Sequence, residues 1–151
     1  MNKKYLLFAV TALALLMNVS IFASGEHESE NYSNSSVIPD VPSVEIIYLN
    51  HGPVRKVITD IDAFLEEYGD RISVSHYTFD SPEGEAFAES KKLKGHIPLA
   101  IFIDGSMEFS VDNHSVEFIS FPKGQGTGFV EDGAWSVNDL KTVIDGILEQ
   151  I

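Results

Sequence analysis

The sequence predicts a mixed α/β domain, with a small central sheet covered by helices on both faces. Strand-like and helix-like patterns alternate over 44–103, in the order strand, helix, strand, helix, strand. This alternation is typical of parallel strands joined by helical crossovers. A turn sequence, Asp104-Gly105, then follows the third strand and favours an antiparallel hairpin beside the parallel pair.

The first predicted strand covers 44–49, a short and largely apolar run rich in β-branched residues. From Pro53 onward the apolar residues fall at helical spacing, with Pro53 in the first turn and Gly69 just past the end. The expected buried face of this helix consists of Val54, Val57, Ile58, Ile61, Phe64, Leu65 and Tyr68.

The second strand and second helix are predicted from alternation followed by a cap. Apolar and polar residues alternate from Ile72, which predicts a strand to about Asp80. Ser81 is the expected N-cap of the next helix, which turns Phe87 inward and leaves Lys91 exposed.

In the rest of the chain, short apolar runs alternate with turn sequences. We expect a strand over 99–103, a strand over 107–111 that pairs back on it, and a further strand over 116–121. Ser136 or Asn138 is expected to cap a last helix with an apolar stripe.

The chain start predicts an exported protein. Lys3 and Lys4 precede an apolar run that is shorter than the roughly 20 residues of a membrane span. We therefore predict a signal peptide over 1–23, with an uncleaved N-terminal anchor as the alternative. A polar linker is predicted over 24–43 and the domain over 44–151. The expected location is periplasmic or secreted, in a bacterium, without stable membrane insertion after cleavage.

Composition excludes some functions. None of the 151 residues is cysteine, so the chain cannot exchange disulfides through thiols of its own. The formal net charge of −13 argues against nucleic acid and anionic membranes, which bind through lysine and arginine. The acidity indicates either solubility alone or a cationic partner.

Three motifs in order resemble the thioredoxin superfamily. His51-Gly52-Pro53-Val54 stands between the first strand and first helix, where the family has Cys-Gly-Pro-Cys. Gly95-His96-Ile97-Pro98-Leu99 is similar to the segment that holds the family's cis-proline, and Ile101-Phe102-Ile103-Asp104-Gly105 to the strand and turn that follow. The resemblance covers essentially all of 44–150 and implies a thioredoxin-like sheet.

The resemblance implies a binding groove that has lost its redox chemistry, since neither imidazole nor isopropyl replaces a thiolate nucleophile. In this fold, the backbone before the cis-proline binds an extended substrate peptide. The groove residues implied here are Asn50, His51, Gly52, Pro53, Val54, His96, Ile97 and Pro98. The alternative is that His51 merely fills a loop. The stretch 112–135 is longer than the family's link to its last helix, and it could carry a strand and a surface loop of its own.

Other chemistry is less well supported by the sequence. The histidines show no zinc-ligand spacing, and the glycine-rich stretch 123–128 lacks the phosphate-loop pattern, which favours a mobile surface loop. Phe121, Phe129 and Trp135 either close this loop onto the core or form a partner-binding patch. No catalytic residues, metal or cofactor are predicted.

Three functions follow from these observations. The first is an exported, redox-inactive thioredoxin-like module that binds a protein or an extended peptide. The second is a metal-binding protein or non-thiol enzyme that depends on His51. The third, an accessory subunit of an envelope complex, would rely on the acidic surface.

Overall fold

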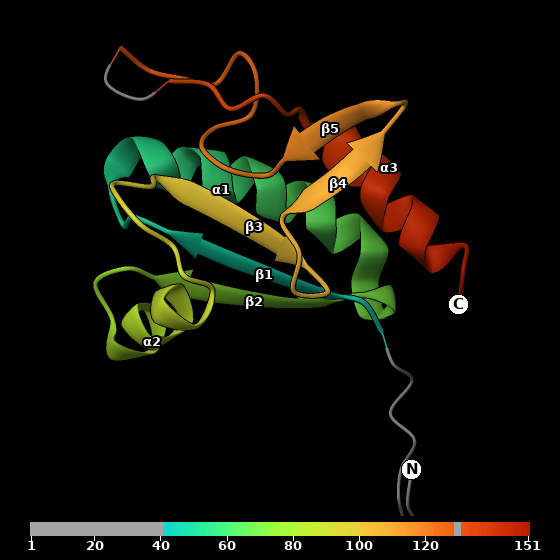
Figure 1. Cartoon of the computed structure of the whole chain (residues 1–151), viewed down its shortest axis with the longest axis horizontal. Coiled ribbons are helices and arrows are strands. Elements are labelled where there is room, and N and C mark those ends of the chain that lie inside the picture. The colour runs from blue at the N-terminus through green and yellow to red at the C-terminus, as the bar shows by residue number, and fades with distance from the viewer. Residues whose placement is uncertain (1–40, 129–130) are drawn as a thin grey trace, which may run out of the picture. The chain divides into compact units, whose positions relative to one another are not determined.

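A computed structural model describes residues 41–128 and 131–151 of the chain. The predicted signal peptide and nearly all of the predicted linker lie outside these residues and stay predictions. In chain order (Figure 1), the elements are β1 (Ser43–Tyr48), α1 (Gly52–Leu65), the 3-10 segment η1 (Glu66–Arg71), β2 (Ser73–Thr78), α2 (Pro82–Ser90), β3 (Leu99–Ile103), β4 (Glu108–Val111), β5 (His114–Glu117) and α3 (Val137–Leu148).

The central sheet has three strands in the order β2-β1-β3. β1 is parallel to β2, with Val44 opposite Val74, and antiparallel to β3, with Ile46 opposite Ile101. The sheet is therefore mixed, as predicted. Its antiparallel strand is β3 itself, however, and not the strand that follows the turn at Asp104-Gly105. The predicted α/β class is confirmed, and this arrangement is compatible with a thioredoxin-like fold.

Helices cover both faces of the sheet, because β3 is buried on both sides and β1 contributes apolar residues to each. α1 and α3 lie on one face and α2 on the other (Figure 1). The larger core joins Val44, Ile46 and Ile101 of the sheet to buried residues of α1 and α3. A smaller core on the α2 side contains Ile47, Phe87, Ile97, Ala100 and Phe102.

The segment 107–111 does not pair back on β3 as predicted. After the turn at Asp104 and Gly105, both with positive φ, only Ser106 pairs with Ile103, and β4 then pairs with β5. The place beside β3 is taken by the chain after β5, where the Ile101 N–H donates to the Phe118 carbonyl at 2.9 Å. The prediction of a strand over 116–121 is thus correct in part, since only its first residues belong to β5.

Two further local predictions need correction. The first helix ends at Leu65, earlier than predicted, and continues as the 3-10 segment η1. Gly69 has the predicted positive φ, 54°, and it breaks this segment at a kink. Lys91 is not simply exposed, because its Nζ donates to Glu45 at 2.8 Å and lies over the rings of Phe87 and Phe102. Its aliphatic stem thus covers the smaller core, and its ammonium group makes cation–π contacts at the edge of that core.

The stretch 112–135 before α3 packs onto the larger core. Phe121 and Trp135 are fully buried, and the Trp135 indole N–H donates to the Ile119 carbonyl at 3.0 Å. The interpretation that these aromatic residues close the loop onto the core is therefore correct for both; Phe129 lies outside the described residues. Ser136, rather than Asn138, caps α3 through a reciprocal capping box with Asp139.

Candidate binding site

The candidate site is built at the start of α1. His51 is the N-cap residue, with extended backbone angles, and its exposed side chain makes no capping hydrogen bond. The Arg55 N–H donates to the His51 carbonyl at 2.9 Å, which closes the first helical turn. The N–H groups of Gly52 and Val54 have no hydrogen-bond partner among the described residues. These donors and the helix dipole favour an acceptor oxygen at this position.

The loop that contains Pro98 lies directly beside the His51 loop. The Leu49 N–H donates to the Pro98 carbonyl at 3.0 Å, which continues the pairing of β1 with β3 beyond the last strand pair. Within the described part of the chain, the N–H and C=O groups of His96 and Ile97 make no hydrogen bond. The loop therefore keeps backbone groups free for a ligand, as an unpaired strand edge does.

A cavity of about 200 Å³ lies between these loops. We call it the His51 cavity; its lining consists of Leu49, His51, Pro53, Val54, His96, Pro98 and Thr127. Five of the eight predicted groove residues are thus brought together. Asn50 and Gly52 are exposed beside the cavity without lining it, and the Ile97 side chain is buried in the smaller core. Ile97 can therefore contribute only its backbone to a ligand in this cavity.

The sequence did not predict that Thr127 lines this cavity. Thr127 belongs to the glycine-rich loop, which the Asp132 carboxylate anchors by accepting the N–H groups of Gly124 and Gly126. The Lys123 N–H also donates to the Trp135 carbonyl at 2.8 Å. The loop is exposed, as predicted, yet it is attached at several points and forms a wall of the site. No local pattern signals this role, because it depends on how the glycine-rich loop packs against α1.

The histidines do not assemble a metal centre in the described residues. His51 and His96 line the same cavity, but two ligands are too few for a structural zinc site. Among residues 41–128 and 131–151, no group of three or more His, Asp or Glu side chains could hold a metal ion. His76 and His114 lie instead near Asp62 and Asp139, at 3.2 and 3.9 Å.

Comparisons with known proteins add no family. No protein-family model matches the chain, and no curated protein sequence matches it either. No helix of the described part has the length and apolar character needed to cross a bilayer. The resemblance to thioredoxins therefore stays a prediction from the three motifs, with which the arrangement of strands and helices is compatible.

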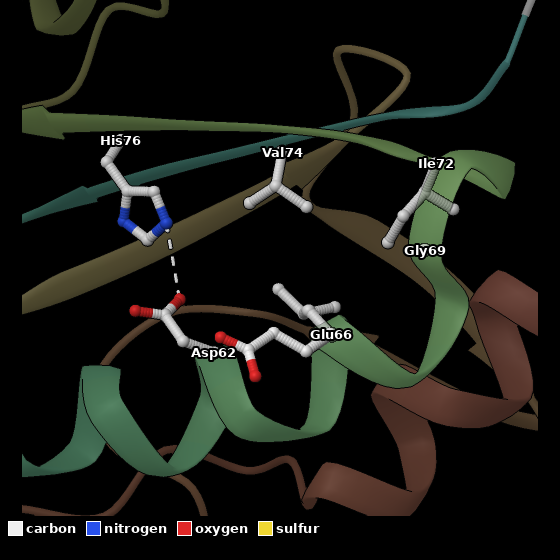
Figure 2. Close-up of a pocket in the computed structure, with 7 residues that line it drawn as sticks. Asp62, Glu66, Gly69, Ile72, Val74 and His76 are labelled. Carbon is white, nitrogen blue, oxygen red and sulfur yellow. Dashed lines mark ion pairs between the residues drawn. The ribbon is translucent and has the colours of Figure 1, made fainter.

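A second and larger cavity lies at the free edge of β2, away from the predicted site. Its volume is about 490 Å³, and it shares no lining residue with the His51 cavity. Figure 2 shows its lining between β2, the end of α1 and η1.

Proposed function

We propose that this chain is an exported, thioredoxin-like module that binds an extended polypeptide at the His51 cavity and performs no thiol redox chemistry. The convergence of three distant segments on one cavity carries the proposal. The loop before α1, the loop before β3 and the glycine-rich loop each contribute to its wall. Such a convergence of polar groups around an apolar cavity is typical of a ligand site.

The chemistry of the cavity suits a peptide backbone. Unpaired N–H groups at the start of α1 can donate to peptide carbonyl oxygens, and the free backbone of His96 and Ile97 can pair with an extended strand. Pro53, Val54 and Pro98 offer apolar surface to a side chain, and His51 offers a hydrogen-bonding ring. The absence of cysteine removes the exchange reaction and leaves these binding groups in place.

A phage-displayed library of random peptides, panned against the full chain, tests this proposal. Selected peptides are expected to lose at least tenfold in affinity for a Thr127→Arg variant, because the new side chain fills the cavity mouth. Thr142→Arg is the matched control, since Thr142 is exposed on α3 and lies outside the cavity lining. Equal binding to both variants would show that the peptides bind elsewhere.

A further inference from the structure

β2 is an edge strand whose outer side is open. It pairs with β1, and no described strand pairs with its other edge. Val74, the second residue of the strand, is 38 % exposed, although it is a large hydrophobic residue. The strand contains no lysine or proline, residues that commonly protect such edges from another chain. An unprotected edge of this kind can accept an added strand.

The cavity beneath this edge, which we call the β2 cleft, combines an apolar surface with two carboxylates. Its lining consists of Asp62, Leu65, Glu66, Gly69, Ile72, Val74 and His76. In Figure 2, the side chains of Val74 and His76 on β2, and of Ile72 just before it, point toward α1 and η1. Asp62 of α1 and Glu66 of η1 lie opposite them. No lysine or arginine lines the cleft.

The two carboxylates are incompletely neutralised by their surroundings. Asp62 Oδ1 lies 3.2 Å from His76 Nε2, yet it is a buried atom without an aligned hydrogen-bond partner among the described residues. Burial raises the pKa of Asp62; His76 opposes this shift and the nearby Glu66 adds to it. Glu66 itself makes no ion pair in the described part of the chain. A cation placed between the two carboxylates would offset the cost of burying the Asp62 charge and the repulsion between Asp62 and Glu66.

We propose that the β2 cleft binds an extended basic polypeptide segment that adds as a strand to β2, with a lysine or arginine between Asp62 and Glu66. Side chains two residues apart lie on the same face of a strand. A ligand residue two positions from the cation would therefore lie on the same face and cover Val74, because Val74 precedes His76 by two residues on β2. The preferred ligand has a cationic and an aliphatic residue separated by one residue.

The charge of the cleft favours a basic partner over two other possible occupants, a second copy of this chain and the chain's own N-terminal segment. A second copy of this chain, with net charge −13, would bring two pairs of carboxylates together at the shared edge. The chain's own segment 24–40 contains Glu26, Glu28, Glu30 and Asp40, and it has no lysine or arginine. Neither occupant supplies the cation that the cleft lacks.

Fluorescence anisotropy with defined peptides tests the proposal on the full chain. The probe is a labelled Thr-Lys-Thr-Val-Thr-Val-Thr peptide, made in both chain directions, with glutamate in place of lysine as the comparison. We expect salt-dependent binding of a lysine peptide and at least tenfold weaker binding of its glutamate counterpart. Two further peptides carry N-methyl groups on alternate backbone nitrogens, one on the odd-numbered residues and one on the even-numbered residues. At least one of them should lose binding, because a methylated nitrogen cannot donate a hydrogen bond to β2.

Matched variants separate the cleft from general charge. Asp62→Asn with Glu66→Gln should lower affinity at least tenfold, whereas Glu67→Gln with Asp70→Asn, outside the cleft lining, should change it less than threefold. Both pairs remove the same charge and preserve side-chain shape. An equal loss in both pairs, or no binding at all, would overturn the proposal. Dimerisation that Val74→Lys abolishes would assign the edge of β2 to a second copy of the chain and would overturn the proposal. Binding of the lysine peptide only after removal of residues 1–40 would assign the edge to the N-terminal segment and would overturn it as well.

The proposals for the His51 cavity and for the β2 cleft are tested independently of each other. Peptides selected at the His51 cavity should bind the Asp62→Asn, Glu66→Gln variant normally, since the two cavities share no residue. Likewise, Thr127→Arg should leave binding of the lysine peptide unchanged.

Discussion

The Leu49 N–H donates to the Pro98 carbonyl at 3.0 Å, and this bond holds the loop before α1 against the loop before β3. Tyr48 and Leu99 are the last paired residues of β1 and β3, so the bond extends their pairing by one step. The candidate site is thus supported by the central sheet, although its residues lie in loops. Sites held in this way by rigid elements bind with less loss of conformational entropy.

Replacing His51 and Val54 together by cysteine should create a reversible internal disulfide. His51 is the N-cap and Val54 lies three residues later in the first turn, so their side chains are neighbours on α1. The exposed position, 51, should provide the attacking thiolate, which a helix N-terminus favours. Mass spectrometry after oxidation and again after dithiothreitol checks the bond. A chain that stays fully reduced under oxidation would contradict the thioredoxin-like alignment.

Asp132→Ala should release the glycine-rich loop without unfolding the domain. The Asp132 carboxylate accepts the N–H groups of Gly124 and Gly126, and their loss leaves the loop attached mainly near Trp135. Hydrogen exchange over 123–128 should accelerate, and the selected peptides should bind several-fold more weakly. Asp112→Ala, at another exposed turn, is the control and should leave this exchange unchanged. Unchanged exchange in Asp132→Ala would show that the carboxylate does not hold the loop.

Tyr68→Phe should destabilise the domain by about 1 kcal/mol at pH 7, the magnitude of a partly exposed hydrogen bond to a charged group. The Tyr68 hydroxyl donates to Asp145 at 2.9 Å and thereby links η1 to α3. Burial first, and then this bond, raise the pKa of Tyr68 to about 12. Urea unfolding measures the loss. Tyr77→Phe should cost less, since the Tyr77 hydroxyl has no hydrogen-bond partner within the described residues.

The loss of stability caused by Tyr68→Phe should become smaller at acidic pH. The hydrogen bond from Lys141 is the main influence that lowers the pKa of Asp145, and Tyr68 adds to it. A carboxyl with a lowered native pKa stabilises the fold above its unfolded pKa, and this stability is lost as pH falls through the native value. The difference between wild type and Tyr68→Phe should therefore narrow below about pH 4. A constant difference down to pH 2 would contradict the role of Asp145.

Asp62→Asn should stabilise the domain at pH 8 and have little effect near pH 3. Burial raises the native pKa of Asp62, so its contribution to stability is present below the unfolded pKa and is lost as pH rises through the native value. The gain should not exceed about 1 kcal/mol, because the side chain is 37 % exposed and water screens the charge. Thermal unfolding at both pH values measures it. Destabilisation at pH 8 would mean that the His76 contact outweighs the cost of burial.

Much of the fold could be predicted because its signals are local. The apolar runs of β1 and β3, the helical spacing of α1 and the Ser136 cap each depend on neighbouring residues. The partner of β4 could not be predicted, because the segment after β5 competes for the same edge of β3. Such competition is decided by tertiary packing, which local patterns do not contain.

The candidate site was predictable to a similar extent. The motifs place His51 and Pro98 together, since both follow from the order of strands and the family resemblance. They do not reveal that Ile97 is buried or that Thr127 closes the cavity. Both facts depend on contacts between segments far apart in the chain. The β2 cleft also depends on such contacts, because it forms where β2 lies beside the end of α1 and the start of η1.

Hydrogen exchange of the full chain, with and without a peptide selected by panning, tests the central claim most directly. If the His51 cavity binds an extended polypeptide, protection should appear over 49–55, 96–98 and 123–128, the segments that surround the cavity. The Thr127→Arg variant should show none of it. Protection confined to β2, or spread without preference over the domain, would contradict the claim.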